Sequence, residues 1–119
     1  MMTDGSASAA SSPTGTSSAS APGKIILVGE HSVVYGRPAI AVPVWEARAK
    51  AVVHSTEGSG GCIIVAHDLG QRVILKDAAI DDPLAMVVRN TLRFIGHSDE
   101  PNWRIEILST IPIASGLGS

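Results

Sequence analysis

The sequence predicts an α+β domain in which several strands, one helix and a further strand precede a glycine-rich loop. Three observations predict this class. Several short segments are apolar throughout or alternate apolar with polar residues, as strands do. One later segment repeats its apolar residues at helical spacing. The order of these segments favours a largely antiparallel or mixed sheet.

Five segments ahead of the helix are predicted strands. Residues 24–28 are a β-branched and leucine run between two glycines, which is typical of a buried strand. Residues 39–44 form a second apolar run. In residues 46–54 the alanines share one face and the charged side chains share the other, so a half-buried strand is expected. Residues 62–66 and 72–75 are predicted to pair through a short turn.

The helix is predicted to start at Asp82 and Pro83, because an acidic N-cap followed by proline is a typical helix start. The pair Asp81 and Asp82 is therefore interpreted as capping and not as an acid–base pair. Helical spacing is shown by Leu84, Val87, Val88, Thr91, Leu92 and Ile95. Of these, Leu84, Val88 and Leu92 are interpreted as core and not as a partner-binding face. Gly96 is the expected C-cap, and residues 103–108 are the last predicted strand.

Composition sets bounds on size and partners. The chain has 119 residues, a formal net charge of −2 and 45% hydrophobic residues, which suits one domain with a buried core. The near-neutral charge and 3% aromatic content favour neither nucleic acid nor an anionic membrane as a partner. Cys62 is the single cysteine, so no internal disulfide can form, and a cytoplasmic location is expected. No apolar run approaches the roughly 20 residues of a membrane helix.

The first residues differ in composition from the rest. Residues 1–20 are mostly Ser, Ala, Thr and Gly, which cannot bury enough apolar area to offset the entropy of ordering. They are predicted to be a disordered tail, and residues 21–119 are predicted to be the folded domain. The tail has neither the basic start nor the apolar stretch of a signal peptide.

Several common site patterns are not met. Lys24 lacks the glycine spacing and the following Ser or Thr of a Walker loop, and the glycines around Gly58 do not fit a dinucleotide-binding loop. His54, His67 and His97 have no metal-ligand spacing to one another or to the cysteine. These histidines are interpreted as solvated or structural.

Two stretches remain as candidates for chemistry. In the first, Lys24 stands at the head of a buried strand, where an anchored backbone presents a mobile ammonium suited to a phosphate or a leaving oxygen. Glu30 and His31 follow the far end of this strand after a glycine that allows a tight turn. The second stretch, residues 112–119, is a glycine loop after a strand. Such a loop, leading into a helix, attracts phosphate through free backbone N–H groups.

These two stretches together resemble the signatures of the GHMP small-molecule kinases. The string APGKIILVGEHSVVYGRPAIA resembles the first signature, most closely that of mevalonate kinases, and PIASGLGS is similar to the start of the second. Galactokinases share Gly-Glu-His but usually continue Thr-Asp-Tyr, whereas this chain continues Ser-Val-Val-Tyr-Gly. The resemblance covers most of residues 21–119. It implies an incomplete N-terminal, ATP-binding domain of the family, with a fold like the second domain of ribosomal protein S5.

The resemblance also implies roles for individual residues. Lys24 would be catalytic, close to the reacting hydroxyl and the transferred phosphoryl group. Glu30 and His31 would act on the acceptor substrate, Glu30 by orienting neighbouring polar groups and His31 by a hydrogen bond. ATP would be bound by Pro112, Ala114, Ser115, Gly116, Leu117, Gly118 and Ser119. The family uses Mg²⁺, but its usual ligands and the usual catalytic base would lie beyond residue 119, so no metal ligand is expected within this chain.

The implied reaction is ATP-dependent phosphorylation of the primary alcohol of mevalonate, a step towards isoprenoids. The 119-residue chain is expected to be a fragment that is inactive alone. Two alternatives stay open, a kinase for another small alcohol (phosphomevalonate, a sugar or a homoserine-like compound) and a non-catalytic nucleotide-binding relic. The expected partner is the small-molecule substrate, with no nucleic acid or membrane, and the resemblance leaves room for an oligomer.

Overall fold

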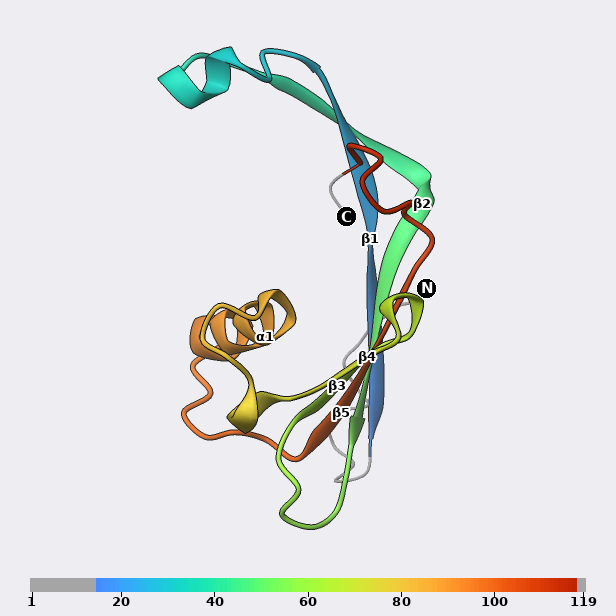
Figure 1. Ribbon diagram of the computed structural model, residues 1–119, viewed down its shortest axis with the longest axis vertical. Helices are drawn as coiled ribbons and strands as arrows, with labels where there is room; N and C mark the ends of the chain where they lie inside the picture. Colours follow the sequence, from blue (N-terminus) through green and yellow to red (C-terminus); the bar gives the residue numbers. More distant parts are fainter. Residues whose placement is uncertain (1–14, 118–119) are drawn as a thin grey trace. The chain divides into compact units, whose positions relative to one another are not determined.

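The structure is a computed structural model that describes residues 15–117. Over these residues the chain forms a five-stranded sheet with one α-helix (Figure 1). The strands lie in the order β1-β2-β5-β3-β4. Their bounds are Thr16–Val28 for β1, Ile40–Ser55 for β2, Ile63–Ala66 for β3, Gln71–Ile74 for β4 and Trp103–Ser109 for β5. The α-helix, α1, is Pro83–Phe94, and the 3-10 turns are η2 (Ser32–Tyr35), η3 (His67–Leu69) and η4 (Leu75–Asp77).

The sheet is mixed, which confirms the predicted α+β class. β3 runs antiparallel to β4, from Ile63 opposite Ile74 to Ala66 opposite Gln71. β3 runs parallel to β5 on its other side. The connection from β3 to β5 contains β4 and α1, as a parallel neighbour requires a crossover connection.

The chain divides into two compact units. The first contains the described residues up to Ala19 together with Ala51–Ile107. The second contains Ser20–Lys50 and the described residues from Leu108 onward. β1, β2 and β5 each contribute residues to both units, whereas α1, β3 and β4 belong to the first.

The first unit contains the hydrophobic core, where α1 packs against β3 and β5. The buried members are Cys62, Ile64, Leu75, Ala85, Val88, Leu92 and Ile105. Trp103 and Ile107 also pack against this core, so the predicted apolar face of the last strand is confirmed. Along α1 the predicted core residues are confirmed, because Val88 and Leu92 are buried and Leu84 packs against them in the core. Val87, on another side of the helix, is 65% exposed.

The ends of α1 follow the predicted capping residues. Asp82 is the N-cap, and its Oδ1 accepts the backbone N–H of Ala85 at 2.9 Å. At the other end the N–H of Gly96 donates to Arg93 O at 3.1 Å, and the N–H of His97 donates to Leu92 O at 2.9 Å. This pair of bonds is a Schellman motif, and it ends the helix where Gly96 was predicted to do so.

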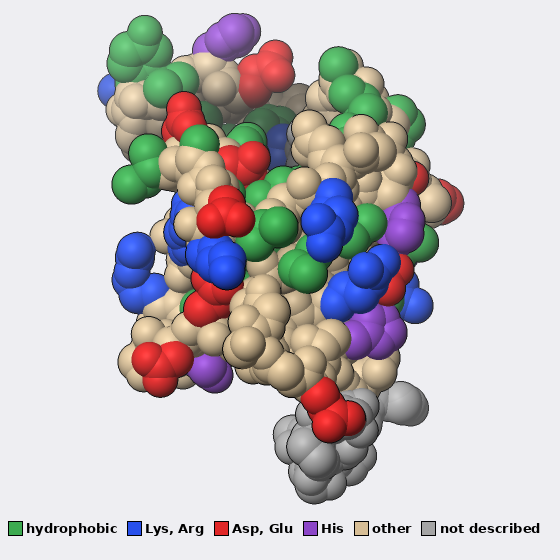
Figure 2. Space-filling view, turned by 60° about the horizontal axis from the view of Figure 1, so that its bottom comes forward, with side chains coloured by type: hydrophobic (Ala, Val, Ile, Leu, Met, Phe, Trp, Pro, Cys, Tyr) green, Lys and Arg blue, Asp and Glu red, His purple; other side chains and the backbone are tan. Residues whose placement is uncertain are grey.

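The second unit buries few side chains and exposes many apolar ones. Ala47 and Ile111 are buried, whereas Leu27, Tyr35 and Trp45 are exposed. On the face of the molecule drawn in Figure 2, hydrophobic side chains in green lie among acidic and basic ones. Backbone hydrogen bonds and polar contacts hold the unit together. Arg48 O accepts the N–H of Thr110 at 2.8 Å.

Two predicted boundaries are corrected. The segments 39–44 and 46–54 form one continuous strand, β2, because no turn-forming residue separates them. β1 begins at Thr16, so the last five residues of the predicted tail 1–20 are in a strand; residues 1–14 lie outside the described residues. The reason is backbone pairing, which needs no apolar side chain: Ser55 donates its N–H to Gly15 O at 3.0 Å. Among the described residues, no helix is long and apolar enough to cross a membrane.

Candidate functional site

The structure brings the two predicted stretches into contact within the second unit. The backbone N–H of Lys24 donates to the carbonyl oxygen of Leu117 at 2.9 Å. Gly23 lies against the same carbonyl, and a Cβ added at Gly23 would be only 3.2 Å from that oxygen. The strand β1 and the glycine loop, 93 residues apart from Lys24 to Leu117, are therefore parts of one local arrangement.

The glycine loop has the backbone geometry of an anion-binding turn. Its φ is positive at Ala114 (57°) and at Gly116 (79°), and it is not positive at Ser115 between them. Alternation of this kind turns successive N–H groups toward one concave side, which is the arrangement called a nest. Ser115 Oγ closes the turn by donating to Pro112 O at 2.7 Å. Gly118 and Ser119, predicted to bind ATP, lie outside the described residues.

Most backbone donors of this loop make no hydrogen bond within the described part of the chain. Residues 113–114 form a turn, and the N–H groups of residues 113, 114, 116 and 117 donate to no acceptor within residues 15–117. Ala114 holds a positive φ that costs an L-residue roughly 1–2 kcal/mol. Strain of this kind, combined with free donors, is typical of sites that bind an anion.

Lys24 combines a fixed backbone with a free side chain. Its main chain is held by β1 and by the bond to Leu117. Its side chain is exposed and has no hydrogen-bond or ion-pair partner among residues 15–117. The ammonium is thus available to a negatively charged ligand near the loop.

A tight turn at Gly29 positions Glu30 and His31. Gly29 has φ +89°, and a Cβ at this position would lie 2.5 Å from Pro38 O, so no other residue fits without a shift of the backbone. Gly29 O accepts the N–H of Val33 at 2.9 Å, which starts the 3-10 turn η2.

Glu30 and His31 remain exposed just before η2. In the described part of the chain, neither side chain contacts Lys24 or the glycine loop through a hydrogen bond or an ion pair. The predicted site residues thus fall into two groups, Lys24 with the loop and Glu30 with His31.

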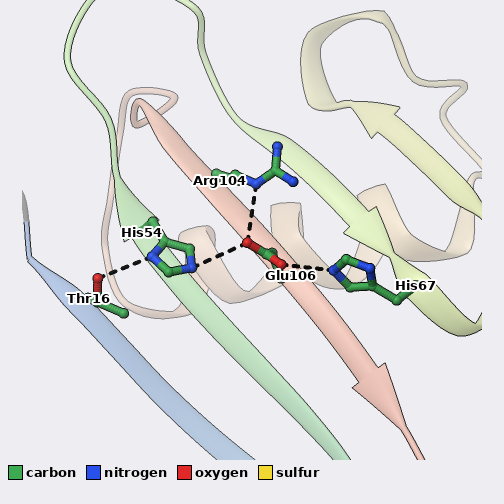
Figure 3. A network of polar contacts seen from close by, with 5 residues as sticks. All are labelled: Thr16, His54, His67, Arg104 and Glu106. Carbon is green, nitrogen blue, oxygen red and sulfur yellow. Dashed lines mark hydrogen bonds and ion pairs between the residues drawn. The ribbon is translucent and has the colours of Figure 1, made fainter.

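A polar network in the first unit was not predicted from the sequence. Glu106 accepts hydrogen bonds from His67 Nε2 at 2.8 Å and from Arg104 Nε at 3.2 Å. His54 Nε2 lies 3.4 Å from Glu106 Oε2, and His54 Nδ1 lies 3.1 Å from Thr16 Oγ1 (Figure 3). Figure 3 shows these side chains on the side of the sheet away from α1.

The network lowers the pKa of its carboxylate. Hydrogen bonds from His67 and then from Arg104 hold the pKa of Glu106 below its ordinary value. His54 and His67, predicted to be solvated or structural, are both partly exposed and both contact Glu106. From the sequence, only the position of Arg104 and Glu106 on the same face of their strand could be predicted. The approach of His67 depends on the parallel register that places Val65 opposite Glu106.

Cys62 is a buried member of the core. Burial, together with the nearby charge of Glu100, raises the pKa of its thiol to about 11. The thiol is therefore protonated at neutral pH. Among residues 15–117, no three His, Cys, Asp or Glu side chains are grouped so that they could hold a metal ion.

Curated relatives and solved structures show what the chain is similar to. It is 40% identical over 102 residues to a mevalonate kinase of Archaeoglobus fulgidus, a match covering 85% of this chain and 32% of the relative. It superposes on the crystal structure of the Methanococcus jannaschii mevalonate kinase with a TM-score of 0.59 and 27% identity, over 84% of this chain and 34% of that one. No family model matches the chain.

A galactokinase of Lactococcus lactis, solved with galactose, shares the fold with a TM-score of 0.61 at 18% identity, over 87% of this chain and 29% of that one. The chain spans about a third of the length of the curated relatives that it matches. The remaining two thirds of those relatives have no counterpart within these 119 residues.

Proposed function

Because the chain belongs to the GHMP kinase family and is most like the N-terminal part of mevalonate kinases, we propose that it supplies the phosphate-binding part of an ATP-dependent kinase. The proposed reaction transfers the γ-phosphoryl group of ATP to the primary alcohol of mevalonate. A bond forms between the alcohol oxygen and phosphorus, the bond to ADP breaks, and the alcohol proton is released. A cytoplasmic location is part of the same proposal.

One observation carries the proposal, namely the hydrogen bond from the Lys24 N–H to Leu117 O. It holds the Lys24 side chain beside a loop in which the N–H groups of residues 113, 114, 116 and 117 donate to no acceptor among the described residues. The loop would bind the phosphates of ATP through these donors, and Lys24 would offset the negative charge that develops on the transferred group. Fixed donors of this kind stabilise the transition state because they need no reorganisation during the reaction.

Glu30 and His31 are proposed to face the acceptor. Both are exposed at the end of β1, and the turn at Gly29 fixes their backbone. His31 would hydrogen-bond the acceptor, and Glu30 would orient polar neighbours. Mg²⁺ belongs to the proposal only as a companion of ATP. The described residues do not fit a metal site of their own, so no step is assigned to a metal held by this chain.

Mevalonate is the proposed acceptor for two reasons. The sequence continues Ser-Val-Val-Tyr-Gly after His31, as in mevalonate kinases, and the curated relatives carry that name. Other small alcohols are the second candidate, because the galactokinase with the same fold was solved with a sugar. A non-catalytic nucleotide-binding module is the third, since the site residues lie within only a third of the relatives' length.

A chimaeric kinase tests the proposal. Residues 21–119 would replace the matching segment of the Archaeoglobus fulgidus relative, and ADP release would be measured with mevalonate, phosphomevalonate, galactose and homoserine. We expect turnover with mevalonate above the other acceptors. The unmodified relative is the matched control, and the 119-residue chain alone, which we predict to be inactive, is assayed beside it.

Each outcome separates the three candidates. Turnover with a different alcohol would replace mevalonate as the acceptor. A chimaera that melts like the relative and binds ATP, but turns over no acceptor, would support the non-catalytic module. Failure of the folded chimaera to bind ATP would contradict the phosphate-loop assignment itself.

A further inference from the structure

A second candidate site lies in the first unit, beside the C-terminal half of α1. It is a cavity of about 510 Å³, within the roughly 300–1,000 Å³ typical of small-molecule sites. Its lining comes from Leu75 and Lys76 of η4, from Arg89, Leu92 and Arg93 of α1, and from residues 97–100. It shares no residue with Lys24 or with the glycine loop.

Four basic side chains line this cavity. Arg89 and Arg93 are four residues apart on α1 and lie on the same face of the helix, and His97 follows after the helix has ended at Phe94. Lys76 adds a fourth nitrogen-bearing side chain from η4. Leu75 and Leu92, exposed by 3% and 8%, supply an apolar part of the lining.

The basic side chains differ in how many of their hydrogen-bond donors already have an acceptor in the protein. Arg89 is fixed, because it donates to Leu75 O at 2.8 Å, to Ala78 O at 3.0 Å and to Ala79 O at 3.1 Å. Arg93 uses only Nη1, in a bond of 3.1 Å to Asn90 Oδ1. The Lys76 side chain has no polar partner within residues 15–117.

His97 is also oriented and leaves one nitrogen available. Its Nδ1 lies 2.7 Å from Asp99 O, and because a carbonyl only accepts, Nδ1 carries the proton. The ring stacks edge-on with Trp103, at 5.9 Å between centroids. Nε2 has no partner among the described residues.

The acidic residues of the lining do not cancel this charge. Glu100 Oε2 already accepts the backbone N–H of Cys62 at 2.9 Å, beside Gly61. Asp99 is the other carboxylate of the lining, against three permanent cations, Lys76, Arg89 and Arg93. The balance is positive, and the groups with unused donors are cationic.

We propose that this cavity binds a small organic anion through a phosphoryl or carboxylate group, held by Lys76 and Arg93, with the rest of the ligand against Leu75 and Leu92. Arg offers several donors in a planar fork that fits the oxygens of either group, and Lys adds a point charge. The site is separate from the glycine loop, so it would bind a ligand other than the ATP and the acceptor of the proposed reaction.

Nuclear magnetic resonance of the 119-residue chain tests this site directly. Inorganic phosphate and acetate are titrated separately, with chloride holding the ionic strength constant. We expect saturable shifts of the amides of residues 89–100 and of the Trp103 indole N–H. Shifts confined to residues 112–117 would report the glycine loop instead and would count against this cavity. Response to one probe and not the other identifies the anionic group.

Two variants and one control make the test specific. Lys76→Met and Arg93→Gln should each weaken binding by about tenfold or more, as expected for loss of a hydrogen bond between charged groups. Lys50→Met removes an exposed lysine outside the cavity and should leave binding unchanged. Both cavity variants change exposed side chains, and their melting curves confirm folding. Equal binding in all three variants, or no saturable shift with either probe, would overturn the proposal.

Discussion

The first unit contains a core of buried apolar side chains, whereas the second buries few and leaves most of its large apolar side chains exposed. In the first, α1 and the sheet enclose residues such as Ile64, which has no solvent exposure. In the second, order comes from backbone hydrogen bonds and from a glycine turn, and the predicted site residues with described positions all lie there. The comparison teaches that stability and proposed chemistry rest on different residues, so substitutions should separate them.

The largest expected effect is a loss of stability in the first unit. Ile64→Ala removes a fully buried side chain and should lower the free energy of unfolding by about 2–5 kcal/mol through lost burial and a residual cavity. Val87→Ala, on the exposed side of α1, is the control and should change it by no more than about 0.5 kcal/mol. Urea unfolding followed by circular dichroism measures both. Similar losses in the two variants would contradict the assigned core.

The second prediction is a loss of activity with no change in stability. Lys24→Met in the chimaeric kinase should lower turnover by about 10²–10³-fold, the usual cost of removing one charge-stabilising donor. The melting temperature should stay unchanged, because the Lys24 side chain has no partner among the described residues. Lys50→Met is the matched control, with both parameters unchanged. Steady-state kinetics measure the turnover of both variants. Unaffected turnover in Lys24→Met would mean that Lys24 has no part in the proposed mechanism.

Sequence reasoning located the core elements because burial imposes a period on the chain. The helical spacing of Val88 and Leu92 and the alternation through Ile105 both follow from packing against a neighbour. The caps of α1 were also local, since Asp82 contacts a group only three residues away. Such short-range signals stay readable without knowledge of the fold.

Part of the candidate functional site, namely Lys24 and the glycine loop, could be predicted from its sequence motifs. The contact between the Lys24 strand and the loop at Leu117 agrees with the pairing of two distant signatures. The positive φ of Ala114 could not be read, because nothing in an alanine indicates left-handed backbone. The Glu106 network depends on strand register between residues 39 positions apart, which no local pattern fixes. The start of β1 also depends on pairing between distant residues, so the predicted strand 24–28 began later than the observed start at Thr16.

The third prediction concerns the turn that positions Glu30 and His31. Gly29→Ala places a Cβ within 2.5 Å of Pro38 O at a φ of +89°, so the turn must shift. We expect a loss of about 1–2 kcal/mol from the backbone strain alone. Gly36→Ala also has a positive φ but meets no atom within 4 Å, which makes it the control for strain without a clash. Urea unfolding should show the larger loss for Gly29→Ala, and equal losses would argue against the close approach to Pro38.

The smallest expected effect tests the network on the sheet of the first unit. Because the pKa of Glu106 is held below its ordinary value of 4.5, the folded protein binds this proton less readily than the unfolded chain. The network therefore contributes its full stability above pH 4.5 and loses it as the pH falls through the lower folded value. Glu106→Gln should lower the melting temperature slightly near neutral pH, with the gap to the wild type closing in acid.

The control for this last prediction is Glu46→Gln, an exposed carboxylate on β2 with no ion pair among the described residues. Its melting temperature should follow that of the wild type at every pH. The comparison requires only thermal melts across the acidic range. A constant gap between Glu106→Gln and the wild type would mean that Glu106 contributes through shape and not through charge. In that case His67 and Arg104 would not act as its charge partners.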